Sequence, residues 1–448
     1  MLRDFSWAAR PLPISVNIRQ QIQRLRYLQM EEESQTQTPK EVHVHFNHTD
    51  SCKFSRWTAR ESFQFMYARP WQEVVEFYSN VVNGHSSLLE LFGTQMPFVH
   101  DDVKIQEISC KTQLDDSSNK EKFGRWARVT FKIVLSYNGG SFDGWQKQPG
   151  LNTVQGLVER SLGRFIDEKK SQQLKDKCKP LKGCAVVAGR TDKGVSALRQ
   201  ICSFYTWRKD VRPHEIEDAI NSSAPGKLRV ISVSEVSRVF HPNFSAKWRR
   251  YLYIFPLNDG EEREDLENFT TDEKYDKQRY GCGEFTSREN GDKSITSDKC
   301  ELEGANKPTT FNICKVNKLL QQLEGKKLSY KIFARDTKAS RNEGPPTECF
   351  VYHARATEAR LPCSVNDHAE GRKVMCVELV ANRFLRKMVR VLLATSIREA
   401  AAGAEENILL KLMDASCRRA SAPPAPPDGL CLVDVGYTEF DPQNCIVP

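Results

Sequence analysis

The stretch AVVAGRTDKGVSALRQICSFYTW, residues 185–207, places a polar segment between two apolar runs. The runs 185–189 and 201–207 have the length and composition of short buried strands. Gly189 and Gly194 flank the polar segment, and glycine tolerates the backbone conformations that a tight loop requires. We therefore expect a strand, a close loop and a second strand within an α/β unit.

Asp192 is the carboxylate of this loop, and Arg190 and Lys193 lie beside it in the sequence. Neighbouring cations favour the ionised form of a carboxyl group. An ionised carboxylate held on a loop can act as a nucleophile or a general base. An aspartate that only shapes an Asx-type turn is the more frequent case, at roughly two to one, so the loop alone does not assign chemistry.

Regular elements follow on both sides of the loop. Apolar residues alternate over 129–135, as in a strand, and recur at helical spacing over 153–166, where Thr153 suits the N-cap. Residues 125–257 are therefore predicted to form one α/β subdomain. A second α/β subdomain of similar size is predicted for 311–448, from helical patterns at 312–323 and 382–401 and apolar strands at 374–380 and 431–435.

Two segments fall outside these subdomains. Residues 1–124 are predicted to be an N-terminal extension of unknown role, in which 54–92 has enough apolar residues for a packed helix. Residues 258–306 carry 15 acidic against 7 basic residues and few apolar ones. This composition predicts a disordered acidic insertion over 258–310.

Composition narrows the class of protein. The formal net charge of +8 over 448 residues permits nucleic-acid binding without proving it. The best apolar stretch, 389–397, is interrupted by Arg390 and is far shorter than the roughly 18 residues of a membrane helix, so a membrane role is not expected. None of the 14 cysteines forms a C-x-x-C pair, which favours reduced intracellular thiols over a zinc site. Five arginines against one acid in the first thirty residues fit a chloroplast or mitochondrial transit peptide or a basic surface helix, so the compartment stays open between cytoplasm, nucleus and organelle.

Three further segments are candidate contacts for a nucleic acid. The glycine-rich loop 137–148 contains Tyr137 and Gln146, whose side chains suit base stacking and edge recognition, although a turn with a Phe-Trp anchor is equally expected. In a strand over 249–255, Arg249 and Tyr251 share a face that could hold a flipped base; a half-buried edge strand is the commoner reason for such a pattern.

The third segment is 382–393. In a helix that spans it, Arg383, Arg386 and Arg390 would line one stripe opposite an apolar face. Arginine pairs bidentately with phosphate or carboxylate, whereas a solvated face is the default for a charge run. Basic residues, Lys247 among them, concentrate in the two α/β subdomains rather than in the acidic insertion, which favours RNA as the partner.

Taken in order, these segments resemble the TruA-type family of tRNA pseudouridine synthases. The matching sequence blocks are YNGGSFDGWQ, TVQ, GRTDKGVSA, FHPNFSAKWRRYLY and ANRFLRKMVR, followed by a closing strand at 429–435. The resemblance covers roughly 125–257 and 311–437, and it depends on the ordered set because each block alone is weak.

The resemblance implies an α/β (α+β) fold in which the two subdomains share an antiparallel sheet and meet at a basic cleft. It implies tRNA as substrate, an anticodon stem-loop target and no cofactor or metal, with a homodimer as one candidate assembly. Asp192 would be the catalytic aspartate, with Tyr251 stacked on the target base and Arg390 paired with the aspartate. Arg386 is the reserve for that arginine, and Arg190 would hold the flipped-out nucleotide.

Among the substrate contacts, Lys193, Tyr137, Gln146, Lys247 and Arg249 complete the expected set. Lys193 and Ser196 depart from the Ala and His of bacterial members and resemble the eukaryotic branch. The resemblance therefore does not identify which uridines of the anticodon stem are the targets. Two other functions compete: a non-catalytic tRNA-binding or RNA-folding protein that keeps the cleft, and a glycosidic hydrolase. The second would normally need two carboxylates, and only Asp192 is convincing.

Overall fold

The computed structural model describes residues 52–95, 128–258, 307–335, 346–362, 371–415 and 417–447, all within one compact unit. The Arg-rich residues 1–51 and most of the acidic insertion, 259–306, lie outside the described residues, so the expectations about them stay predictions. No helix in the described part is long and apolar enough to cross a membrane.

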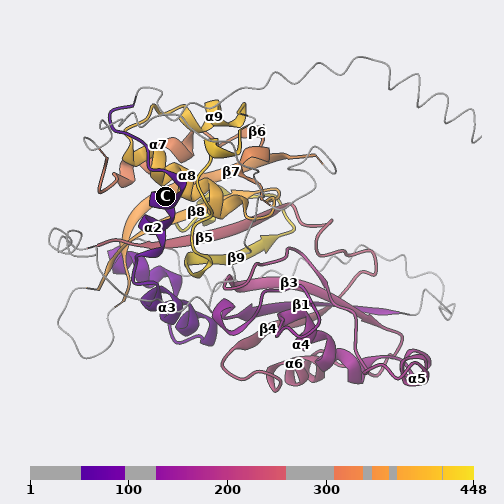
Figure 1. Ribbon diagram of the computed structural model, residues 1–448. Helices are drawn as coiled ribbons and strands as arrows, with labels where there is room; N and C mark the ends of the chain where they lie inside the picture. Colours follow the sequence, from indigo (N-terminus) through magenta and orange to yellow (C-terminus); the bar gives the residue numbers. More distant parts are fainter. Residues whose placement is uncertain are drawn as a thin grey trace, which may run out of the picture. The chain divides into compact units, whose positions relative to one another are not determined.

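The core of the described chain is one nine-stranded sheet with the order β4-β1-β3-β9-β5-β8-β7-β6, in which β2 pairs with the edge of β3 (Figure 1). The strands are β1 Val129–Tyr137, β2 Val186–Val187, β3 Ser196–Thr206, β4 Leu228–Val236, β5 Trp248–Pro256, β6 Lys326–Ser329, β7 Glu348–Arg360, β8 Lys373–Ala381 and β9 Leu430–Gly436. All pairs are antiparallel except β3 with β9, which is parallel. The predicted α/β class and shared antiparallel sheet are confirmed.

The parallel pair is the junction between the two halves of the sheet. It is short, with Ser196 opposite Cys431 and Ala197 opposite Leu432. β5 comes from the first predicted subdomain, yet it pairs on both sides with strands of the second half, β8 and β9. The two halves are therefore continuous through hydrogen bonds rather than only packed against each other.

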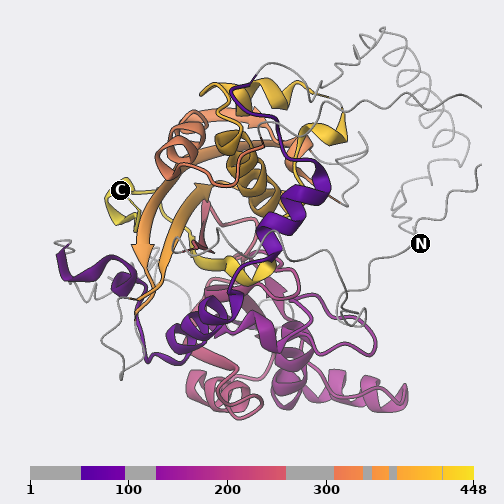
Figure 2. The same ribbon diagram turned by 60° about the vertical axis from the view of Figure 1, so that its left-hand side comes forward.

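Helices cover both faces of this sheet (Figures 1 and 2). They are α2 Ala59–Tyr67, α3 Trp71–Asn83, α4 Val154–Ser161, α5 Glu168–Asp176, α6 Pro213–Asn221, α7 Ile313–Gln321, α8 Met388–Ala401 and α9 Ile408–Met413. Short 3-10 turns include η4 Leu162–Phe165 and η8 Pro427–Gly429. α8 packs in the main core, whereas α3 lies in a second apolar cluster on the opposite side of β5.

β5 shows how the sequence period produces two faces. Tyr251, Tyr253 and Phe255 belong to the main core, and Leu252 and Ile254 belong to the cluster with α3. Alternate side chains of a strand point to opposite faces, so the alternation predicted for this segment is confirmed. The N-cap role of Thr153 is also confirmed, because its side chain accepts a hydrogen bond from Gly156 N.

The helix predicted over 382–401 begins only at Met388, so the expected stripe of three arginines is wrong. Lys387 has a φ of +59°, which a right-handed helix excludes. The loop before it is held by distant partners instead: Phe350 N donates to Asn382 Oδ1 at 2.9 Å, and Arg335 N donates to Arg386 O at 3.1 Å. Periodicity could not show these non-local bonds.

The N-terminal segment 52–95 contains the packed helix predicted from its apolar residues. Tyr78 in α3 is completely buried, and its hydroxyl lies 3.0 Å from Gly429 O and 3.4 Å from Leu252 O. α3 is thereby fastened to the junction between β9 and β5.

We expect Tyr78→Phe to lower the free energy of unfolding by about 1 kcal/mol or somewhat more, because it leaves a buried carbonyl without its donor. Tyr352→Phe is the control, since the Tyr352 hydroxyl makes no hydrogen bond to another described residue. Urea denaturation measures both, and equal stability of the two variants would contradict this role of Tyr78.

Candidate active site

Asp192 lies in a tight turn immediately before β3. Val195 N donates to Asp192 O at 3.2 Å, and Gly194 has a φ of +84°. A side chain at Gly194 would also meet Pro427 Cγ at 2.9 Å. The glycine is therefore needed both for the turn and for the close approach of the segment before β9.

A buried polar network supports the turn from below. The hydroxyls of Tyr137 and Thr191 lie 2.8 Å apart, and Gln200 Nε2 donates to Gly189 O at 2.7 Å and to the Tyr137 hydroxyl at 3.3 Å. Tyr137 is only 1% exposed, and burial raises the pKa of its phenol. The structure therefore places this expected substrate contact in the core beneath the loop, where it fixes the loop's position.

The glycine-rich loop 137–148 packs against the other side of the turn. Gly144 has a φ of +92°, and a side chain there would lie 3.1 Å or less from backbone atoms of Thr191, Asp192 and Lys193. Trp145 is buried and donates its backbone N–H to Thr191 O at 3.1 Å. The predicted Phe-Trp anchor thus exists, and it leaves Gln146 on the cavity surface.

Arg390, in the first turn of α8, reaches the carboxylate from the second half of the chain. Its Nη1 lies 3.6 Å from Asp192 Oδ2, and its Nε donates to Ala425 O at 2.6 Å. The side chain of Arg390 is 9% exposed and that of Asp192 is 31% exposed. The arrangement is a fixed, nearly buried cation beside a carboxylate that solvent or a ligand can reach.

Tyr251 on β5 is the third member of the predicted catalytic set, and it lies in the same cavity. Its ring meets the ring of Phe384 edge to face, with centroids 5.1 Å apart at 86°. Burial raises the pKa of Tyr251 to about 12; the Arg249 cation partly opposes this, and the Asp192 charge adds to it. The phenol therefore keeps its proton at neutral pH and can donate a hydrogen bond beside the carboxylate.

Arg249 holds three loops together rather than facing solvent. Its guanidinium donates to Asn382 O at 2.7 Å, to Ala188 O at 3.0 Å, and to both oxygens of Asn243. Burial lowers the pKa of Arg249. Lys247, in contrast, is exposed, pairs with Glu439 and does not line the cavity.

The cavity around Asp192 has a volume of about 1350 Å³. Its described lining contains seven cations and two carboxylates, so the basic cleft is confirmed. The cations are Arg190, Lys193, Arg249, Arg383, Arg386, Lys387 and Arg390. Arg386 and Arg383 line this cavity from the loop before α8, so both lie at the same cavity as Arg390, although the helix does not extend to them.

Phe244 is the lining residue that the sequence did not single out. It is 83% exposed at the cavity, and its ring stacks on His241 with centroids 4.2 Å apart. Burial is the usual expectation for a phenylalanine side chain. Exposure follows here from the fixed backbone of Asn243, which Arg249 holds.

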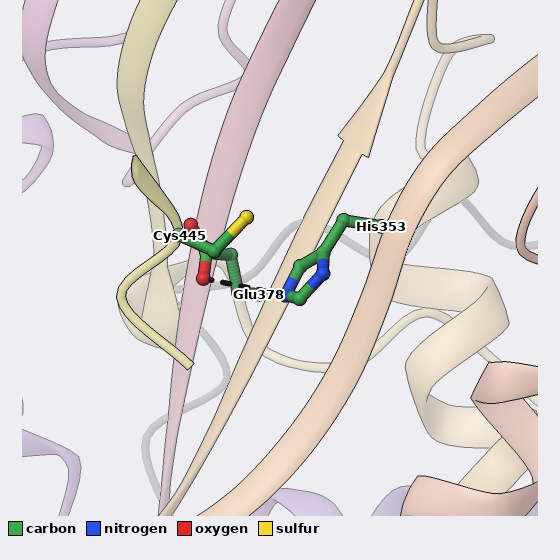
Figure 3. A group of neighbouring side chains, drawn as sticks. All are labelled: His353, Glu378 and Cys445. Carbon is green, nitrogen blue, oxygen red and sulfur yellow. Dashed lines mark ion pairs between the residues drawn. The ribbon is translucent and has the colours of Figure 1, made fainter. Parts of the chain in front are cut away.

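Among the described residues, one group could in principle hold a metal ion: His353, Glu378 and Cys445. Figure 3 shows these side chains converging from β7, β8 and the segment after β9, and their ligand atoms lie within 4.8 Å of one another. All three are buried, and burial raises the pKa of the Cys445 thiol to about 12, so the thiol is neutral here.

The donors of this group are already engaged by protein groups. Glu378 Oε2 accepts from the backbone of Ile446 at 2.8 Å and of Val447 at 2.7 Å. His353 Nε2 lies 2.8 Å from Val447 O, and Arg250 Nε lies 3.3 Å from Glu378 Oε1. A buried guanidinium beside the carboxylate opposes a second cation. The group therefore fastens segment 444–447 to the face of the sheet away from Asp192.

Comparisons with known proteins point to one family. Residues 320–438 match a family model described as tRNA pseudouridine synthase. The protein named tRNA pseudouridine synthase A from Pelodictyon phaeoclathratiforme is 38% identical over 124 residues, which are 28% of this chain and 45% of that protein. In this comparison the chain spans less than half the length of its relative.

Longer similarities exist at lower identity. The protein named tRNA pseudouridine synthase A from Chlorobaculum tepidum is 29% identical over 69% of this chain and 99% of its own length. The protein of the same name from Pseudothermotoga lettingae is 24% identical over 68% of this chain and 99% of its own length. The family-model match includes Arg390 but not Asp192 or Tyr251.

The stability of the protein should fall as pH rises from about 10 to 12, partly through Tyr251. In that range the unfolded tyrosine, with a pKa of about 10, releases its proton while the buried one keeps it, so the unfolded state is favoured. We expect Tyr251→Phe to reduce this slope by about 1.4 kcal/mol per pH unit. Urea titrations at several pH values measure it, and an unchanged slope would refute the assignment.

Proposed function

We propose that this chain, which resembles the TruA-type family of tRNA pseudouridine synthases, is a member of that family and converts uridine to pseudouridine in tRNA. The observation that carries the proposal is the Arg390–Asp192 pair, formed by distant parts of the chain at the wall of a basic cavity. An enzyme of this kind is an isomerase, and its substrate is a nucleotide within a folded RNA.

The reaction moves one bond and one proton. The N1–C1′ bond of the uridine breaks, a C5–C1′ bond forms, C5 loses its hydrogen as a proton and N1 gains one. No electrons leave the substrate, so the side chains need only hold the base, assist bond cleavage and move protons. Asp192 can serve by attacking the sugar as a nucleophile or by removing a sugar proton as a base.

Arg390 supports either use of Asp192. Its Nη1 lies 3.6 Å from Asp192 Oδ2, and the bond from its Nε to Ala425 O fixes the guanidinium in place. Loss of Arg390 would remove the cation that pairs with the carboxylate and leave the carboxylate freer to rotate. Arg390 is therefore proposed to position the catalytic group.

Tyr251 and the basic lining complete the proposed site. The neutral phenol of Tyr251 can stack against the target base, or donate a hydrogen bond while the base loses the C5 proton and gains the N1 proton. Arg190, Lys193 and Arg386 face the cavity and are proposed to bind the phosphates around an extruded nucleotide. The resemblance of the Asp192 loop extends the proposal to uridines of the anticodon stem-loop.

Hydrolysis of a glycosidic bond is less well supported. Asp143 is the second carboxylate of the described lining, but its oxygen lies 2.9 Å from Lys193 Nζ. The hydrogen bond from Lys193 holds the pKa of Asp143 below its ordinary value. A carboxylate that is ionised at neutral pH cannot supply the general acid that such hydrolysis requires.

Asp192→Asn should abolish pseudouridine formation in tRNA while the affinity for tRNA changes only a few-fold, because the amide keeps the shape but cannot act as nucleophile or base. Asp143→Asn is the matched control and should retain activity. The assay follows tritium release from tRNA labelled at uridine C5, and binding is measured separately. Full activity of Asp192→Asn would end the catalytic assignment; binding without activity in the wild type would favour the non-catalytic alternative.

Arg390→Ala should lower kcat by about 100-fold or more, since removal of a group that positions a catalytic residue has effects of that order. Arg383→Ala should mainly raise KM, because Arg383 lines the cavity without a contact to Asp192. Steady-state kinetics on the same tRNA separate the two, and equal kcat losses would undo the choice of Arg390.

A further inference from the structure

A second hollow, of about 1020 Å³, lies outside the cavity that contains Asp192. It is formed by η4, α5 and the end of β3, and its wall contains Trp207, four cations and three carboxylates, the last being Asp167, Glu168 and Asp210. We call residues 164–182 together with Trp207 the α5 surface. In Figures 1 and 2 α5 lies at the outer edge of the β1–β3–β4 half of the sheet.

The α5 surface is separated from the catalytic loop along the length of β3. Val186, at the rim of the cavity, pairs with Ser203, and Trp207 follows four residues later, about 13 Å away at the rise of a strand. From Ser196, next to the Asp192 loop, the same path is about 36 Å. A nucleotide bound at Asp192 therefore does not reach the α5 surface, whereas a larger RNA could touch both.

Charge is concentrated on the α5 surface. Residues 164–182 contain seven cations and three carboxylates, a net charge of +4, which is half of the formal charge of the whole chain. Six of the cations are lysines: Lys169, Lys170, Lys175, Lys177, Lys179 and Lys182. In the described part of the chain no carboxylate forms an ion pair with any of them, so their charges stay available to a ligand.

Packing does not account for this helix. None of the nine residues of α5 is buried, and of these only Leu174 packs partly against the main core. A helix of this length is marginal in water by itself, and Asp167 caps it by accepting from Lys170 N at 2.9 Å. The fold thus maintains a short, solvent-exposed polar helix, and most of the net positive charge of the α5 surface comes from Lys177, Lys179 and Lys182, which follow it.

Trp207 adds a flat apolar surface to these charges. It is 40% exposed, and its indole meets the ring of Tyr205 edge to face, with centroids 5.3 Å apart at 83°. The Arg128 guanidinium lies 4.9 Å from the other ring of this pair, Tyr205, so the tryptophan stands on a fixed support. Arg208 is held at the same edge by Asp210 and by Arg164 O.

We propose that the α5 surface binds a second part of the RNA substrate, remote from the modified uridine, through lysine–phosphate contacts and stacking of one accessible base on Trp207. Lysines alone would suit any polyanion, but an exposed indole among cations is the combination that single-stranded nucleic acid uses. The inference rests on the proposed function for the identity of the RNA, a tRNA.

The test compares two fourfold variants of the full chain that lose the same charge. One replaces Lys169, Lys175, Lys177 and Lys179 with Gln. The matched control replaces Lys318, Lys326, Lys327 and Lys411 with Gln, exposed lysines of the other half of the sheet. Filter binding of a whole tRNA transcript at several salt concentrations gives the affinity and its salt dependence, and circular dichroism confirms folding.

We expect the α5-surface variant to bind the transcript about 10- to 100-fold more weakly at moderate salt, and its log–log salt slope to fall by about 3, while the control changes little. Trp207→Ala should weaken binding about five- to tenfold or more, with recovery in Trp207→Phe. On whole tRNA the KM should rise with kcat unchanged, and an isolated anticodon stem-loop should bind wild type and variant equally.

Equal losses of tRNA affinity in the two fourfold variants would overturn the proposal. It would also be overturned if polyglutamate, used as a competitor, abolished the difference between the variants while single-stranded RNA did not. That result would assign the surface to an acidic protein. Because filter binding does not require turnover, its results stay decisive even if the wild type binds tRNA without modifying it. Binding of tRNA without modification would contradict the proposed function but not the proposal that the α5 surface binds RNA.

Discussion

The arrangement of the whole site depends on two residue pairs of parallel strand, Ser196 with Cys431 and Ala197 with Leu432. This short contact joins the half of the sheet that carries the Asp192 loop to the half that leads to α8. It also brings Pro427 against Gly194, so the loop cannot move away from the segment that binds Arg390. The carboxylate and its cation meet because the sheet is continuous.

Sequence periodicity predicted most of the regular elements, since the strand and helix periods reflect which side chains are buried along one segment. It predicted the two faces of β5 and the cap at Thr153. It failed at residues 382–387, where carbonyls and an amide bond to partners such as Arg335 and Phe350. Such bonds depend on the three-dimensional neighbours, which a single sequence does not display.

In the candidate site, too, the sequence predicted part of the arrangement and missed what depends on three-dimensional neighbours. A local motif identified Asp192, and a resemblance connected it with Arg390, but neither could distinguish residues facing the cavity from residues supporting it. Tyr137 and Arg249 carry polar groups that suit RNA, yet both use them on the protein's own loops. Phe244, which looks like a core residue in the sequence, is instead displayed at the cavity.

Neighbouring residues of β5 have different roles, because alternate side chains line the cavity or pack on the opposite face of the sheet. Tyr251 faces the cavity, whereas Leu252 faces the cluster that contains α3, and Arg250 faces Glu378. Natural selection can therefore act on alternate positions of one strand for different reasons. Substitutions on one side change what the cavity accepts, and those on the other side change how firmly the strand is held. A lineage can in this way diverge in substrate choice without a matching loss of thermal tolerance.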